Sequence, residues 1–256
     1  MPHGGSRRIG VLCALEQEVA YLLDNLEHAE TFDAAGMAFH AGRLDGEAVV
    51  LAKAGMGKVN AAIAATLLIE RFGASAVMFS GVAGGLDPAL SVGDVVIADH
   101  VVQHDHGYEG PGGFVVYQHG HQPFFNPFDG LGLALDAALA GRIAAALADY
   151  EPSPLSVTAE ASTRPPRIHF GRVLTGDQFI NNEQVREALF RDFDARAVEM
   201  EGAAMAQVCA AFGVPWVVIR ALSDLAGHES HFDIHRFLDE VARSGALIVR
   251  RLLPVV

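Results

Sequence analysis

The sequence predicts an α/β fold in which a central mixed, twisted sheet lies between two layers of helices. Two observations indicate this architecture. Short continuous apolar runs recur along the chain, as expected of strands that helices cover on both faces. These runs end in glycine turns and are followed by helical segments, so that strand, turn and helix alternate. We therefore expect a three-layer α/β/α single domain over residues 7–256, preceded by a disordered N-terminus at 1–6.

The first part of the chain begins with a buried strand over 9–14, after which Glu16 opens a helix that reaches Leu23. Asp45-Gly46 suits the positive φ angles of a tight turn, so its flanking segments are expected to form an antiparallel hairpin. The hairpin strands are 39–44 and 47–54, and they are followed by a helix over 58–72 and strands over 76–80 and 92–102.

In the second part, residues 151–167 hold Pro152, Pro154, Pro165 and Pro166 among polar residues, which predicts a surface insertion without regular structure. The other expected elements are an alanine-rich helix over 133–148, strands over 168–175 and 216–222, a strand-to-helix transition near Glu201, and a closing helix over 232–253.

The composition limits which kinds of binding partner are expected. Hydrophobic residues make up 51% of the chain and charged residues 19%, which favours apolar surface reserved for a partner subunit. The net charge of -13 argues against nucleic acid or an anionic membrane as a partner, because both require a basic face. A homo-oligomer with a small-molecule ligand fits this balance.

The two cysteines indicate the compartment. Cys13 and Cys209 lie in segments that read as a buried strand and a buried helix, which favours reduced core thiols over a disulfide or a metal site. The N-terminus lacks an apolar stretch of signal-peptide type, and no segment reaches the run of about 20 apolar residues that a membrane span needs. These features predict a cytoplasmic protein.

A cluster of charged residues stands out in apolar sequence. Glu199, Glu201 and Arg220 lie close to Asp224, although apolar runs that become buried rarely carry unpaired acids. One glutamate could reach a ligand while the other caps a helix or pairs with Arg220. Asp224 ends a strand at the carboxyl edge of the sheet, where open α/β folds bind ligands, but it could equally cap a following helix.

Two further segments allow either a structural role or a role in ligand binding. Glu18 follows the first strand at the same edge, yet an acid in a first helical turn also complements the helix dipole. Gly55-Met56-Gly57 follows a hairpin strand, which excludes a dinucleotide fingerprint, and Val59 stands where a phosphate loop needs Ser or Thr. What remains is a turn that lets the backbone approach a ligand, or a purely structural turn.

Several histidines precede the proline-rich insertion. Their spacing is a weak signal for metal and no cysteine joins them, so a loop whose histidines are mostly solvent-exposed is favoured. We expect neither a metal nor a cofactor. The histidines are His100, His104, His106, His119 and His121.

Six segments in this order resemble the nucleoside phosphorylase and nucleosidase superfamily, and most of all the bacterial 5'-methylthioadenosine/S-adenosylhomocysteine nucleosidases. The resemblance implies a nucleoside phosphorylase-like fold, a homodimer, and hydrolysis of the N-glycosidic bond of a 5'-modified adenosine, with release of adenine in methionine and S-adenosylmethionine salvage. The matching segments are 9–19, 55–59, 81–86 with 92–94, 176–180, 198–204 and 220–224.

The resemblance also implies residue roles. Asp224 would donate a proton to purine N7, Glu201 would bind the ribose hydroxyls, and Glu18 would hold and activate the attacking water. The implied substrate-binding residues are Ser223, which steadies Asp224, Met200 under the sugar, Phe179 on the base, Ile180 at the base edge, and Glu199, Met56, Val82 and Gln178.

The chemistry accounts for these acids, because glycosidic cleavage creates a cation-like sugar and an anionic base. Burial among apolar residues should raise the pKa of Asp224 enough for it to donate near neutral pH. Similar phosphorylases carry an arginine just before the turn that here reads Ser80-Gly81-Val82, and Glu18 would repel a phosphate dianion, so hydrolysis is favoured over phosphorolysis.

Three departures from the nucleosidase pattern keep other substrates open. Val82 stands where Ser is usual, Gln178 where a small residue is usual, and the stretch from His104 to Arg167 is enlarged. In such dimers the loop after the Val95 strand caps the partner's alkylthio pocket. The alternatives are a purine nucleoside phosphorylase, a hydrolase of a futalosine-like nucleoside or adenosylated lipid precursor, and a non-catalytic nucleoside-binding relative.

Overall fold

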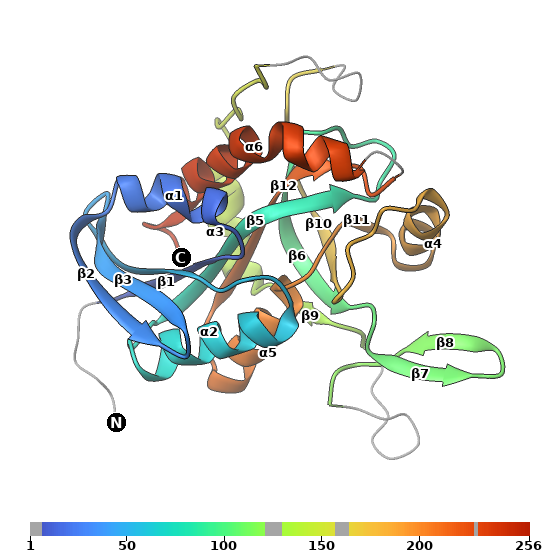
Figure 1. The fold of residues 1–256 in the computed structure, drawn as a ribbon, viewed down its shortest axis with the longest axis horizontal. Helices are drawn as coiled ribbons and strands as arrows, with labels where there is room; N and C mark the ends of the chain where they lie inside the picture. The colour runs from blue at the N-terminus through green and yellow to red at the C-terminus, as the bar shows by residue number, and fades with distance from the viewer. Residues whose placement is uncertain (1–6, 121–129, 157–163, 228–229) are drawn as a thin grey trace.

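A twisted mixed sheet forms the centre of the molecule, with helices on both of its faces (Figure 1). The computed structural model describes residues 7–120, 130–156, 164–227 and 230–256. This architecture confirms the predicted fold class. The strands are β1 (Ile9–Cys13), β2 (Glu27–Ala34), β3 (Met37–Leu44), β4 (Glu47–Lys53), β5 (Ala76–Gly85), β6 (Val95–Gln103), β7 (Gly107–Gly110), β8 (Gly113–Val116), β9 (Leu133–Ala134), β10 (Ile168–Thr175), β11 (Ala195–Glu199) and β12 (Trp216–Asp224).

The helices form the two outer layers. In Figure 1, α1 and α6 cover one face of the sheet, and α2 and α5 cover the other. Small residues let α2 approach the sheet closely, since it buries Ala61, Ala64, Ala65 and Leu68. The helices are α1 (Glu16–Asp24), α2 (Lys58–Glu70), α3 (Ala137–Leu147), α4 (Glu183–Phe193), α5 (Gly202–Phe212) and α6 (Ser230–Leu252).

The centre of the sheet is parallel. β1 lies between β4 and β5, and β5 continues to β12, all with parallel pairing. These strands are the continuous apolar runs that the sequence marked as buried. The expected hairpin is also confirmed, because β3 and β4 pair antiparallel around Asp45-Gly46.

The sheet curls until β5 also meets β11, and this closure builds the site. β5 pairs with β12 along one edge and, at its last residues, with β11 along the other. Gly84 pairs with Asp224 on one side and with Val198 on the other. A Cβ atom on Gly84 would lie 3.0 Å from the Asp224 carboxylate, so glycine permits the close approach of the two strands.

Some elements differ from the sequence expectation. Residues 133–148 were expected as one helix, but Leu133–Ala134 pairs with β6, and α3 begins only after Asp136, whose carboxylate accepts a hydrogen bond from Leu139 N at 2.8 Å. The sequence also gave no prediction of β2, of the β7–β8 hairpin or of α4. β2 is almost wholly exposed and carries no apolar run, and α4 buries no residue fully, although its Leu189, Phe190 and Phe193 pack against an apolar cluster.

The ends of the proline-rich insertion are not purely surface structure. Residues 157–163 lie outside the described part of the chain, as do residues 1–6. Leu155 packs against the core, and Arg164 binds the carboxylate of buried Asp94. The described ends of the insertion are therefore fixed to the start of β6.

Both cysteines are free and buried, Cys13 in β1 and Cys209 in α5, and burial raises the pKa of each thiol, that of Cys209 to about 12. This confirms the prediction of core thiols. Among the helices of the described ranges, none combines the length and hydropathy needed to cross a membrane.

Asp94 concentrates most of the polar contacts at the start of β6. Its carboxylate accepts hydrogen bonds from Ser91 N at 3.0 Å and Arg167 N at 2.8 Å, and Arg164 binds both oxygens, at 2.6 and 2.8 Å. Burial alone would raise the pKa of Asp94, but these donors and the His169 imidazole outweigh it and hold the pKa well below its usual range. Asp94 is thus an ionised acid that ties the insertion to the sheet.

We predict that Asp94→Asn lowers the free energy of unfolding by about 3 kcal/mol at pH 7, because the amide group faces donors that require an anion. The folded-state pKa is depressed, so the contribution of Asp94 is present above pH 4 and is lost as the pH falls further. Urea unfolding at pH 7 and pH 3 measures the difference in the free energy of unfolding between wild type and Asp94→Asn at each pH. Asp192→Asn, in an exposed pair with Arg191, is the control and should change stability by less than about 0.5 kcal/mol. A difference between wild type and Asp94→Asn that does not shrink at pH 3 would contradict this account.

Candidate active site

A cavity opens where the carboxyl ends of β1, β5, β11 and β12 converge. It contains about 570 Å³ of space outside protein atoms, part of which is open to solvent. All of the site residues named from the sequence lie on its wall. The lining consists of Ala14, Leu15, Glu18, Met56, Val82, Ala83, Gly84, Gln178, Phe179, Ile180, Val198, Glu199, Met200, Glu201, Ser223, Asp224 and Ile234.

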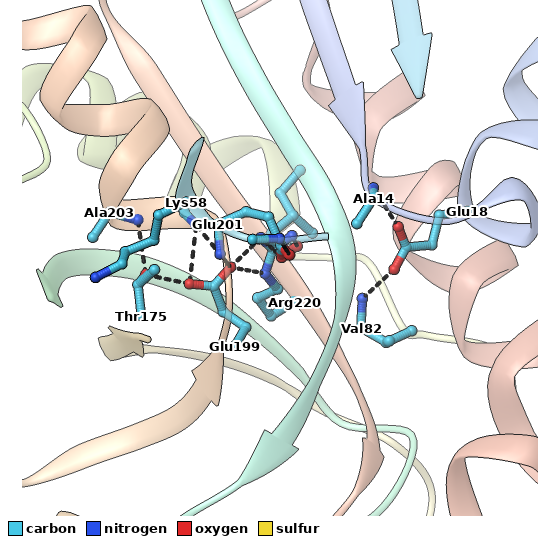
Figure 2. A network of polar contacts seen from close by, with 12 residues as sticks. Ala14, Glu18, Lys58, Val82, Thr175, Glu199, Glu201, Ala203 and Arg220 are labelled. Atoms are coloured by element: carbon cyan, nitrogen blue, oxygen red, sulfur yellow. Dashed lines mark hydrogen bonds and ion pairs between the residues drawn. The ribbon is translucent and has the colours of Figure 1, made fainter. Parts of the chain in front are cut away.

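Glu18 is held rigidly by backbone donors. Its Oε2 accepts hydrogen bonds from Ala14 N at 2.7 Å and Leu15 N at 2.8 Å, and its Oε1 accepts one from Val82 N at 3.0 Å (Figure 2). The two readings of Glu18 therefore coincide, because the same carboxylate caps the start of α1 and faces the cavity. Burial raises the pKa of Glu18 despite these donors, so it is a more basic carboxylate than a solvated glutamate.

Glu199 forms a buried ion pair with Arg220, as expected from the sequence. Arg220 Nε donates to Glu199 Oε2 at 3.0 Å, and Nη2 contacts the same oxygen. Gly202 N donates to both carboxylate oxygens, at 2.8 and 3.0 Å, and the Thr175 hydroxyl donates to Oε1 (Figure 2). Glu199 was expected among the ligand-contacting residues, but these donors occupy its oxygens. Its place in the structure is that of a cap for α5 and a partner for Arg220.

Glu201 faces the cavity with fewer partners. Gly57 N donates to its Oε1 at 2.8 Å, and Arg220 Nη2 lies 3.6 Å from its Oε2. Burial first, and then the charge of Glu199, raise the pKa of Glu201 to about 7. This carboxylate can accept hydrogen bonds from a ligand hydroxyl, and the glycine turn at 55–57 contributes one of its donors, so that turn has a role in the site.

Asp224 is the acid at the end of β12. Ser223 Oγ donates to its Oδ2 at 2.9 Å, and Ala226 N donates to Oδ1 at 2.8 Å. Burial raises its pKa against these bonds, in the direction that a proton donor needs.

Glu18 and Arg220 meet at Gly81. A Cβ atom on Gly81 would lie 2.7 Å from Arg220 Nη1 and 3.0 Å from Glu18 Oε1, so glycine leaves the space in which the two charges approach. The Arg220 guanidinium carbon lies over the Phe79 ring, 4.6 Å from its centre. The stretch around Gly81 contains no Lys or Arg. The cation beside it is Arg220 of β12, which already pairs with carboxylates.

Apolar groups form the rest of the wall. Phe179 and Met56 are among the most exposed large apolar side chains, at 50% and 61%, and both border the cavity. An exposed ring beside an apolar cavity is suited to stacking on a flat ligand. Met200, Val82 and Gln178 complete this side.

Sequence reasoning did not name six lining residues: Ala14, Leu15, Ala83, Gly84, Val198 and Ile234. The first five lie within the segments 9–19, 81–86 and 198–204 that carry the family resemblance, so the motif positions could have indicated them. Ile234 comes from α6, and only the packing of that helix over β12 brings it to the site; no local signal marks it.

The histidine segment differs from its expectation. His104 is buried, His100 and His119 are half-buried, and only His106 is exposed, so the prediction of mostly solvent-exposed histidines is wrong; His121 lies outside the described residues. His100 lies in β6, and His104 directly follows that strand, where its backbone N donates to Thr175 O at the end of β10. In the part of the chain that the structure describes, no three His, Cys, Asp or Glu side chains group as metal ligands would.

We predict that Glu201→Gln becomes more stable than wild type as the pH rises. The folded-state pKa of about 7 exceeds the ordinary 4.5, so the folded state retains the proton longer and wild-type stability falls between these values, by about 3 kcal/mol. The glutamine mimics the protonated acid and avoids this cost. Urea unfolding at pH 5 and pH 8 measures the change, with exposed Glu187→Gln as the control. If the free energy of unfolding of Glu201→Gln differed from that of wild type by the same amount at pH 5 and pH 8, the raised pKa would be refuted.

Comparison with known proteins agrees with this geometry. The model of the phosphorylase superfamily matches residues 8–254. The 5'-methylthioadenosine/S-adenosylhomocysteine nucleosidase of Mycobacterium bovis is 50% identical over 248 residues, which cover 97% of each chain. The Colwellia psychrerythraea nucleosidase of the same name, solved with adenine, superposes with a TM-score of 0.82 at 34% identity over 98% of this chain and 96% of that one. Futalosine hydrolase of Helicobacter pylori superposes with a TM-score of 0.80 at 28% identity over 98% of each chain. The chain therefore belongs to the phosphorylase superfamily and, within it, to the 5'-methylthioadenosine/S-adenosylhomocysteine nucleosidases.

Proposed function

We propose that the protein hydrolyses the N-glycosidic bond of 5'-methylthioadenosine, S-adenosylhomocysteine or a related 5'-modified adenosine and releases adenine. The observation that carries this proposal is the grouping of Glu18, Glu201 and Asp224, three buried carboxyl groups that face one cavity and all have raised pKa values. The names of the full-length relatives support the same activity.

Each acid has a separate task in this reaction. Asp224 donates its proton to the departing purine, and Ser223 orients the carboxyl group for that transfer. Glu18 accepts a proton from the attacking water, and its fixed position between the backbone donors of α1 and β5 sets where the water lies. Glu201 binds the ribose hydroxyls and stabilises the positive charge that develops on the sugar.

The rest of the wall binds the neutral parts of the nucleoside. Phe179 stacks on the base, and the backbone of Ile180 reads its edge, while Met200 lies under the sugar. Met56, Val82 and Gln178 border the remaining space.

Water is the acceptor in this proposal because of the charge balance of the site. Glu18, Glu199 and Glu201 surround Arg220, which already binds Glu199. With all four groups ionised the cluster carries a net negative charge, so a phosphate dianion would be repelled where a neutral water is not. No cofactor is required for this reaction.

A second candidate is hydrolysis of a futalosine-like nucleoside. Futalosine hydrolase of Helicobacter pylori is among the similar solved structures, and Gln178 adds an amide beside the position of the base. The choice between the two substrates depends on the groups carried by the base and by the 5'-carbon.

We place the reaction in methionine and S-adenosylmethionine salvage, in the cytoplasm, where reduced Cys13 and Cys209 are stable. Recovery of the protein outside the cytoplasmic fraction of its cells would contradict the cytoplasmic location.

We predict that the protein is a homodimer in solution. Around the start of α2, Met56, Val59 and Ile63 are 61%, 70% and 39% exposed. Phe114 and Val115 are also exposed, and they lie on the β7–β8 hairpin, which protrudes from the body in Figure 1. Such apolar area favours a second copy of the chain. Light scattering should give twice the chain mass, and Val59→Glu should shift it toward the monomer. A monomeric wild type would refute this.

We predict that the wild-type protein releases adenine from 5'-methylthioadenosine without phosphate, and that Asp224→Asn and Glu18→Gln each lower kcat about 10²- to 10⁴-fold, since each removes one proton-transfer group. Adenine release is followed with and without phosphate, and with futalosine in a parallel reaction. Glu187→Gln on α4 is the matched surface control and should retain wild-type turnover.

Each other outcome selects an alternative. Strict phosphate dependence would make the protein a phosphorylase, and cleavage of futalosine alone would make it a hydrolase of that nucleoside. Tight binding of 5'-methylthioadenosine without turnover would leave a non-catalytic binding protein. Full turnover by Asp224→Asn would show that another group protonates the base.

A further inference from the structure

A ring of polar contacts lies beside the cavity without lining it. It joins Lys58 at the start of α2, Asp105 just after β6, and Asp177 in the segment that follows β10. None of these three residues takes part in the proposed reaction.

The three residues close on one another. Lys58 Nζ donates to Asp105 Oδ1 at 2.6 Å, Asp177 N donates to Asp105 Oδ2 at 2.8 Å, and Lys58 N donates to Asp177 Oδ1 at 2.8 Å. The side chains of Lys58 and Asp105 are only 20% and 18% exposed, so solvent screens their attraction less than it would on an open surface. Burial would raise the pKa of Asp105, but the Lys58 ammonium and the Asp177 N–H outweigh it and lower that pKa, so Asp105 is ionised near neutral pH.

Two groups of the site are attached directly to this ring. Gly57, adjacent to Lys58, donates its N–H to Glu201 Oε1 at 2.8 Å. Asp177 precedes Phe179 by two residues in the segment that borders the cavity. The ring of polar contacts therefore connects Gly57, whose N–H donates to Glu201, with Phe179, the side chain that stacks on the base.

His104 fixes the beginning of the same segment. Its backbone N donates to Thr175 O at 3.0 Å, and a Cβ atom on Gly176 would lie 2.3 Å from its Nε2. The buried imidazole thus covers Gly176 directly, and the segment leaves β10 in contact with both His104 and Asp105.

We propose that Asp105 is a positioning residue, which with Lys58 and Asp177 sets the spacing between Glu201 and Phe179 and thereby determines nucleoside affinity. The inference rests on the proposed function, because it assumes that Glu201 binds the sugar and Phe179 stacks on the base. Asp105 touches neither the proton donor Asp224 nor Glu18, so its loss changes binding and leaves the chemical step nearly unchanged.

The test compares Asp105→Ala and Asp105→Asn with wild type in kcat, KM and the dissociation constant of adenine. Asp105→Ala removes both bonds and should raise KM and the adenine dissociation constant about tenfold, with kcat within about twofold of wild type. Asp105→Asn retains an acceptor for Asp177 N and should recover part of the affinity. The matched control is Asp45→Asn, which removes the charge from a carboxylate that Arg250 Nε binds at 2.7 Å, outside the cavity lining.

An unchanged KM in Asp105→Ala overturns the proposal, whether kcat falls or stays the same. Amide hydrogen exchange of residues 176–180 keeps this result separate from a failure of the proposed function. If wild type releases no adenine, the function fails, while faster exchange of 176–180 in Asp105→Ala at unchanged global stability still supports the ring. Unchanged exchange in that segment overturns it.

Discussion

The buried ion pair between Glu199 and Arg220 is the interaction on which the site depends. Arg220 has no exposed surface, so its charge must be balanced by neighbouring acids. Glu199 balances it and also caps α5, which fixes the end of β11 and the start of the helix together. Removing either partner would leave an uncompensated buried charge, and such changes cost about 3–5 kcal/mol. The position of Glu201, two residues after Glu199, follows from this anchor.

The same guanidinium shapes the ionisation of the other acids. Burial raises the pKa of Glu18 and of Glu201, the neighbouring carboxylates raise that of Glu201 further, and Arg220 lowers both. Because one cation serves several acids, none of the pKa values falls to that of a fully paired carboxylate. Asp224 lies on the same strand as Arg220, and burial is the main cause that raises its pKa. A donor and an acceptor of protons can therefore coexist in one cavity near neutral pH.

Much of this could be predicted from the sequence, because buried strands are continuous apolar runs and an acid within or after such a run is conspicuous. β1, β4, β5 and β12 were found in this way. β2 and α4 were not, since β2 lacks an apolar run and the apolar face of α4, with Leu189 and Phe193, is short and only partly buried. His104 was misjudged because its burial comes from contacts with Thr175 and Gly176, at and just after the end of β10, which the sequence around His104 does not record. Ile234 and the curl that joins β5 to β11 depend on tertiary packing, which no local pattern records.

The curl of the sheet explains why acids so distant in sequence act together. β6 and β12 are antiparallel, so in a flat sheet the carboxyl ends of β10 and β11 would lie at the edge opposite to that of β12. The antiparallel pairing of β11 with the last residues of β5 brings Val198 opposite Gly84, which is itself the partner of Asp224. Glycines at positions 81, 84 and 85 permit that approach, since a Cβ atom at any of them would meet atoms at 3.1 Å or less. The chemistry of the cavity thus depends on glycines in β5 as much as on the acids themselves.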